Sequence, residues 1–189
     1  MPNVDNPNGF TPAYHQSGGT IRQKEYRILS GEAASIFNGD LVALGVNGGI
    51  AVSAASTPSI GVFMGCSYTA ANGEIIYSPQ WVGGTVTAGT APATAWVVDD
   101  PNVVFRAQFS GASGIAQIGS TFDVLPTAGD TVTGRSRMEV DSADAVDALL
   151  RLLDFVPSPD NDSEDLNAEA FVMIAEHQLA PSATSGDIS

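Results

Sequence analysis

Hydrophobic residues alternate with other residues most clearly in the middle of the chain. From Val103 to Phe109 every second side chain is apolar, and Arg106 and Gln108 lie on the opposite face. A period of two is typical of a β-strand with one buried face. Similar short runs, rich in Val, Ile, Thr and aromatic residues, occur along most of the chain. Each is three to ten residues long, which leaves little room for long helices.

Turn-forming dipeptides separate these runs at intervals of roughly 8–12 residues, a spacing typical of a β-sandwich or barrel. Asn-Gly and Gly-Gly pairs supply the positive φ angles that tight turns need. We predict an all-β fold, an antiparallel β-sandwich or barrel of short strands with little helix. The predicted strands are Thr20–Leu29, Leu41–Val46, Ile50–Val52, Ile60–Tyr68, Glu74–Trp81, Trp96–Val98, Val103–Phe109 and Phe171–Leu179.

Two hairpins follow from this pattern, one at Asn47-Gly48-Gly49 and one at Asn72-Gly73. Asp99-Asp100-Pro101-Asn102 has the composition of a turn. The segment Ser142–Val156 is ambiguous, because its apolar residues fit a helical period but also form a short run closed by Pro157. We favour a helical turn near Ala143–Ala148 followed by a strand.

The ends of the chain differ from its centre. Residues 1–17 are mostly polar or turn-forming, which predicts an extended N-terminal arm that contributes little to a core. A β-rich domain then spans residues 18–180, with an acidic loop at 157–169, and residues 181–189 form a C-terminal tail. Carboxylates concentrate after Met138. This shift could mark a second domain, but one domain with an acidic face is the simpler interpretation.

The net charge is strongly negative. The chain of 189 residues has 7 basic and 21 acidic side chains, giving a net charge of −14. Such a surface repels phosphate backbones and anionic lipids, so we expect neither a nucleic acid nor a membrane as partner. No stretch approaches the ~18–20 apolar residues of a membrane span. The N-terminus lacks the features of a signal or transit peptide, so we expect synthesis in a cytoplasm.

The chain offers few groups for catalysis. His15, His177 and Cys66 are the only residues of their types, and no nucleophile elbow or phosphate-binding glycine motif is present. The simplest interpretation makes both histidines structural and the thiol buried and inert. An EF-hand calcium loop that began at Asp160 would need a glycine and a glutamate at fixed later positions, and both are missing. We therefore predict no catalytic, cofactor or metal residues and no enzymatic activity, although two carboxylates of a glycosidase could still meet in space.

Three basic residues, Arg22, Lys24 and Arg27, fall in the first predicted strand. They could bind an acidic neighbour, or simply protect an edge strand from aggregation. Trp81 and Trp96 lie near strand ends, where tryptophan can form an interface hot spot, although packing in a core is the simpler interpretation.

Several segments resemble small virion structural proteins of tailed bacteriophages. They are Asn6–Phe10, Ser17–Arg22 with Tyr26–Ile28, Ile36–Asp40, Ile60–Tyr68, Asp99–Asn102 with Phe105 and Gln108, and Leu153–Val156 followed by Pro159–Asn161. Such proteins are commonly proposed to be capsid decoration, or cement, proteins. The resemblance implies β-rich subunits on the capsid exterior that bind the major capsid protein and stabilise the head, often as homotrimers. It also implies a strand at Leu149–Val156, and it transfers no individual binding residue.

We therefore expect a virion structural protein without cofactors, whose partners are the phage major capsid protein and further copies of itself. A tail tube, head-completion or fibre-base protein remains an alternative, and a β-fold carbohydrate-active enzyme is a second one. The residues predicted to contact a partner are Asn6, Pro7, Asn8, Phe10, Tyr14, Arg22, Lys24 and Trp81.

Overall fold

The fold is all-β, as predicted, and two antiparallel sheets of six strands make up an arrangement consistent with a β-sandwich. The computed structural model describes residues 3–45, 47–144 and 148–180. Its strands are β1 (Thr11–His15), β2 (Lys24–Ile28), β3 (Leu41–Leu44), β4 (Ile50–Val52), β5 (Gly61–Thr69), β6 (Ile75–Ser78), β7 (Ala93–Val98), β8 (Val103–Gln108), β9 (Thr121–Leu125), β10 (Glu139–Asp144), β11 (Leu150–Phe155) and β12 (Glu169–Ile174). Two short 3₁₀ turns, η1 (Ala88–Thr90) and η2 (Ile115–Gln117), are the helical elements of the described residues, and neither could span a membrane.

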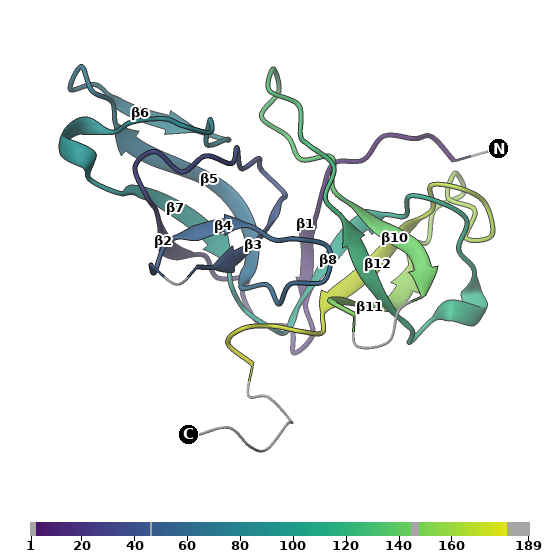
Figure 1. Cartoon of the computed structure of the whole chain (residues 1–189). Helices are drawn as coiled ribbons and strands as arrows, with labels where there is room; N and C mark the ends of the chain where they lie inside the picture. Colours follow the sequence, from purple (N-terminus) through teal and green to yellow (C-terminus); the bar gives the residue numbers. More distant parts are fainter. Residues whose placement is uncertain (1–2, 46, 145–147, 181–189) are drawn as a thin grey trace.

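Each sheet is curled. The first sheet has the order β1-β8-β12-β11-β9-β10, and the second has the order β2-β7-β5-β3-β4 with β6 added beside β5 (Figure 1). A bridge between Phe109 and Val140 brings the end of β8 next to β10. A bridge between Arg27 and Gly49 does the same for β2 and β4. Both sheets therefore wrap around their own apolar interiors.

Two clusters of buried residues form the core. One is centred on the first sheet and includes Phe105 and Phe122, and the other lies within the second sheet around Phe63 and Trp81. Leu41, Val62 and Val98 belong to the second sheet but pack in the first cluster. The sheets therefore share buried contacts instead of standing as separate cores.

Both predicted hairpins are confirmed, as β3–β4 and β5–β6. The turn at residues 99–102 is also present, because the Val103 amide donates to the Asp100 carbonyl (3.1 Å). This turn joins strands of different sheets, β7 and β8, so it is a crossover. The strand at 149–156 appears as β11. The helical turn expected at 143–148 is wrong at its start, which belongs to β10, and residues 145–147 lie outside the described residues.

The N-terminal region departs from the expected arm. Thr11–His15 forms β1 and pairs with β8, and Phe10 is 1% exposed in the first core cluster. Residues 3–9 precede Phe10 as an extended segment outside the strands. Strands β9 and β10 were not anticipated from the sequence, because Ser, Thr, Gly and charged residues interrupt their apolar pattern. The predicted tail at 181–189 lies outside the described residues.

Candidate functional site: a polar groove along the N-terminal segment

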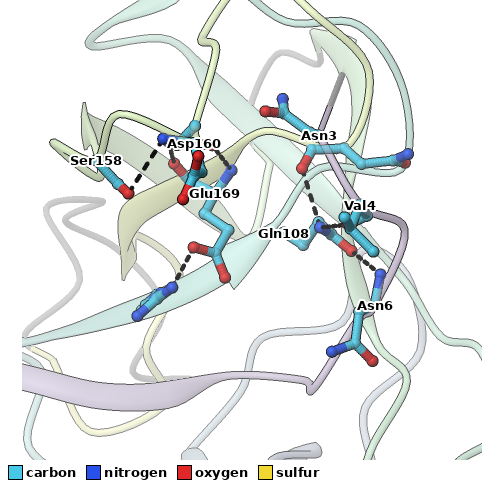
Figure 2. A pocket seen from close by; sticks show the side chains of 10 residues that line it. Asn3, Val4, Asn6, Gln108, Ser158, Asp160 and Glu169 are labelled. Atoms are coloured by element: carbon cyan, nitrogen blue, oxygen red, sulfur yellow. Dashed lines mark hydrogen bonds and ion pairs between the residues drawn. The ribbon is translucent and has the colours of Figure 1, made fainter. Parts of the chain in front are cut away.

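The N-terminal segment lies on the surface of the first sheet and is held there by two amide side chains. The Nδ2 amide of Asn3 donates to the carbonyls of Asp162 (2.8 Å) and Leu166 (2.9 Å), and its Oδ1 accepts the Asp162 amide (2.8 Å). Gln108, on β8, donates to the Val4 carbonyl (2.8 Å) and accepts the amide of Asn6 (3.0 Å), as Figure 2 shows. The segment therefore bridges β8 and the acidic loop.

A tight glycine contact ends this segment. Gly9 has a φ of +65°, and a Cβ there would lie 2.4 Å from Cβ of Ser136. The next amide, that of Phe10, donates to the Gly39 carbonyl (2.9 Å). Only glycine fits so close an approach at a positive φ. The Asn8-Gly9 pair thus directs Phe10 into the core and leaves Asn8 on the surface.

Three adjoining hollows follow the segment, and together we call them the N-terminal groove. Their volumes are about 290, 250 and 570 Å³. Asn6 contributes to all three, while Arg106 and Arg135 each contribute to hollows that adjoin. Most of the lining residues are polar. The residues that line the groove include Asn3, Asn6, Asn8, Arg106, Gln108, Asp130, Thr133, Arg135, Ser136, Arg137, Asp160 and Glu169.

The groove gathers three of the seven basic residues of this acidic chain. Arg106 forms an ion pair with Glu169 across neighbouring strands. Arg135 donates from Nη1 to Oδ1 of Asn8 (3.3 Å), and Arg137 lies 3.7 Å from Oδ2 of Asp130. Three carboxylates, those of Asp130, Asp160 and Glu169, also line the groove, so its charges balance although the chain as a whole is strongly negative.

A loop between β9 and β10 borders the groove and projects from the body of the molecule (Figure 1). Asp130 organises it, because Oδ1 accepts the amides of Val132 (2.8 Å) and Thr133 (3.4 Å). These bonds, the first above all, lower the pKa of Asp130. Val132 is 92% exposed.

A second surface lies on the other sheet. Tyr77 on β6 is 74% exposed and stacks against Trp96 of β7 (ring centroids 6.3 Å apart). Ile75 lies on the same face of β6, and a bridge from Ala70 to Thr87 brings Val86 to the same end of β5. We call the exposed residues Ile75, Tyr77 and Val86 the β6 patch.

Most of the residues predicted to contact a partner lie in three places: in the groove, in the core and on the exposed face of β1. Asn6, Pro7 and Asn8 line the groove. Phe10 and Trp81 are fully buried in this chain, so in this fold they cannot contact a partner, which corrects their prediction as contact residues. Tyr14 is exposed on β1, where its ring meets the edge of Phe171 (centroids 5.6 Å).

Arg22 and Lys24 lie away from the groove. Arg22 donates from Nε to the buried carboxylate of Asp99 (3.2 Å), and Lys24 lies over the ring of Tyr26 (5.2 Å to the centroid). The Tyr26 hydroxyl also donates to Asp99 (2.8 Å), and burial, followed by this bond, raises the pKa of Tyr26. This group joins β2 to the crossover between the sheets, so part of the basic strand serves the fold.

The remaining candidate groups have structural environments. His15 lies 3.2 Å from Asp100, and the Nδ1 atom of His177 accepts the Leu179 amide (3.1 Å). Burial lowers the pKa of His177. Burial raises the pKa of the Cys66 thiol to about 11, which keeps it protonated and unreactive near neutral pH.

The acidic loop is organised by an asparagine. Asn161 donates to the carbonyls of Val156 (2.9 Å) and Glu169 (2.8 Å) and accepts the Glu169 amide (2.8 Å). Among the described residues, no group of three or more His, Cys, Asp or Glu side chains is placed to hold a metal ion.

Sequence reasoning did not single out Arg106, Arg135 or Arg137. The only available signal was the Arg135-Ser136-Arg137 spacing in a chain with few bases, since nothing in the sequence joins Arg106 to this pair. In comparisons with known proteins, no family model, curated protein or solved structure matches this chain.

Proposed function

We propose that this chain is a virion structural protein, a capsid decoration protein that binds the outer surface of a major capsid protein lattice and stabilises the head. The observation that carries the proposal is the β6 patch, in which Ile75 and Tyr77 lie exposed on β6, a strand that pairs only with β5 among the described residues. Exposed apolar groups on an edge strand are a liability in a free monomer and mark a contact surface.

Other features support the same function. The resemblance of the N-terminal and central segments to phage virion proteins is spread over most of the chain. A decoration protein needs contact area of roughly 1,200–2,000 Å² and no reaction chemistry. The net charge of −14 would keep decorated particles soluble and apart. We expect the protein to assemble as a homotrimer, which native mass spectrometry would detect.

The test is binding to undecorated, expanded heads of the parent phage. The intact protein should co-sediment with the heads and raise the temperature at which they release DNA. Ile75→Ser combined with Tyr77→Ser should weaken binding by at least about ten-fold, since each loses buried apolar contact of about 1.5–3 kcal/mol.

Ile115→Ser serves as the matched control, because Ile115 is equally exposed (60%) but lies in η2, in the other half of the chain. It should bind heads as the intact protein does. Failure of the intact chain to bind heads, or formation of stacked tubes by the protein alone, would contradict a decoration role. Tubes would instead indicate a tail protein.

A further inference from the structure

The largest hollow of the N-terminal groove contains two arginines that are only loosely engaged. It has a volume of about 570 Å³, and we call it the arginine hollow. Arg135 forms no ion pair within the part of the chain that the structure describes, and its contact with Asn8 is a neutral one at 3.3 Å. Both arginine side chains are exposed. The residues that line the hollow are Asn6, Pro7, Asn8, Asp130, Thr133, Arg135, Ser136 and Arg137.

Among the residues that the structure describes, one carboxylate lines the hollow, that of Asp130, and it does not satisfy these arginines. Oδ1 of Asp130 is already used to cap the amides of Val132 and Thr133. Its other oxygen lies 3.7 Å from Arg137, beyond hydrogen-bonding distance. A guanidinium has five N–H donors in a fixed fork that matches a carboxylate. Most donors of Arg135 and Arg137 therefore remain available to a ligand.

The overall charge of the chain does not prevent an acidic ligand from binding here. At physiological ionic strength, charges further than roughly 8 Å are largely screened, whereas direct pairs persist. A carboxylate in the hollow would meet two guanidinium groups and the side-chain amides of Asn6 and Asn8. Charge-assisted bonds of this kind are about twice as strong as neutral ones.

We propose that the arginine hollow binds the carboxylate side chains of an acidic segment of a partner protein, with Arg135 and Arg137 as the binding residues. The projecting loop that carries Val132 stands at the rim and contacts the partner beside this segment. The identity of the partner as a capsid protein rests on the proposed function, but the binding chemistry of the hollow does not.

The experiment is an NMR titration of the full chain with N-acetylated hexaglutamate at about 0.15 M ionic strength, where distant charges are screened. The expected result is saturable shifts of the backbone amides of Asn8 and Arg135–Arg137. Combining Arg135→Gln with Arg137→Gln should weaken binding by at least about ten-fold, as expected for the loss of charge-assisted hydrogen bonds. Arg151→Gln, an exposed arginine on β11, is the matched control and should leave binding unchanged.

Three outcomes would overturn the proposal. They are the absence of shifts in the intact protein at millimolar peptide, equal binding by the double variant, and tighter binding of hexathymidylate than of hexaglutamate at the same amides. The last would assign the hollow to a phosphate backbone. Head binding by the intact chain without peptide binding would refute the hollow and leave the decoration role. Peptide binding without head binding would support the hollow and refute that role.

Discussion

Asp40 is a buried carboxylate immediately before β3, with 2% of its surface exposed. Oδ2 accepts the Phe37 amide (2.8 Å), which fixes the turn that precedes β3. Burial raises the pKa of Asp40 to about 6, although the bonds from Ser136 and Phe37 oppose this shift. A carboxylate prefers the neutral form in such surroundings because desolvation penalises its charge.

The raised pKa of Asp40 makes the free energy of unfolding depend on pH. The folded pKa of about 6 exceeds the unfolded value of 3.8, so the folded state binds the proton more tightly. The stabilisation from protonation is complete below about pH 4 and is lost as the pH rises through 6. Two pKa units correspond to roughly 3 kcal/mol.

We therefore expect Asp40→Asn to increase the free energy of unfolding relative to the intact chain more at pH 7.5 than at pH 4.5. Asparagine keeps an oxygen for the Phe37 amide but carries no charge. Urea unfolding at both pH values measures the difference, with the exposed Asp160→Asn as control. An equal effect of Asp40→Asn at both pH values would show that Asp40 is ionised with an ordinary pKa.

The N-terminal region combines two elements with different roles. β1 pairs with β8 over four aligned positions, and the buried Phe10 anchors its start. The preceding residues 3–8 contact the body mainly through Asn3, Val4 and Asn6 at the surface. Strand pairing and aromatic burial belong to the fold, while the surface segment shapes the groove.

Two truncations should separate these roles. Removing residues 1–8 should leave a folded protein with an altered groove, whereas removing residues 1–17 deletes β1 and Phe10. Loss of a buried aromatic side chain alone costs about 3–5 kcal/mol. Circular dichroism melting should therefore show a near-intact midpoint for the short truncation and a greatly lowered one for the long truncation. Equal melting of the two proteins would mean that β1 contributes nothing to the fold.

Side chains of the second sheet are buried in the core cluster of the first sheet, which joins the two sheets. Leu41 lies on β3 of the second sheet but is fully buried in the cluster centred on the first. Its backbone amide also approaches the sulfur of Met138 (3.4 Å), which precedes β10. Shared burial of this kind should make unfolding of both sheets a single cooperative event.

Leu41→Ala should lower the free energy of unfolding by about 2–5 kcal/mol, because it removes apolar contact and leaves a cavity. Hydrogen exchange should show an equal loss of protection at Val97 in β7 and Val172 in β12. Leu179→Ala, at a residue that is 46% exposed, should have little effect on either amide. Loss of protection in the second sheet alone would show that the sheets unfold independently.

The class of fold, both hairpins and the position of the crossover turn were predictable, because they depend on local chemistry. Asn-Gly pairs, apolar alternation and the Asp-Pro-Asn composition act over a few residues. β9 and β10 escaped this reasoning, since long-range pairing supplies what their interrupted apolar patterns lack. Phe10 was placed on an arm because its neighbours in the sequence are polar, and a local pattern does not reveal the distant residues among which it is buried.

The amino-acid sequence alone determined that this chain forms short antiparallel strands, carries a strong negative charge and has few groups suited to catalysis. The tertiary structure decided which sheet each strand joins, that Phe10 and Trp81 are buried, and that Arg135 and Arg137 share a hollow with Asn6 and Asn8. The physical reason is that strand pairing and burial join residues more than 100 positions apart, such as Asn8 and Arg135. No local pattern of side chains encodes such a contact.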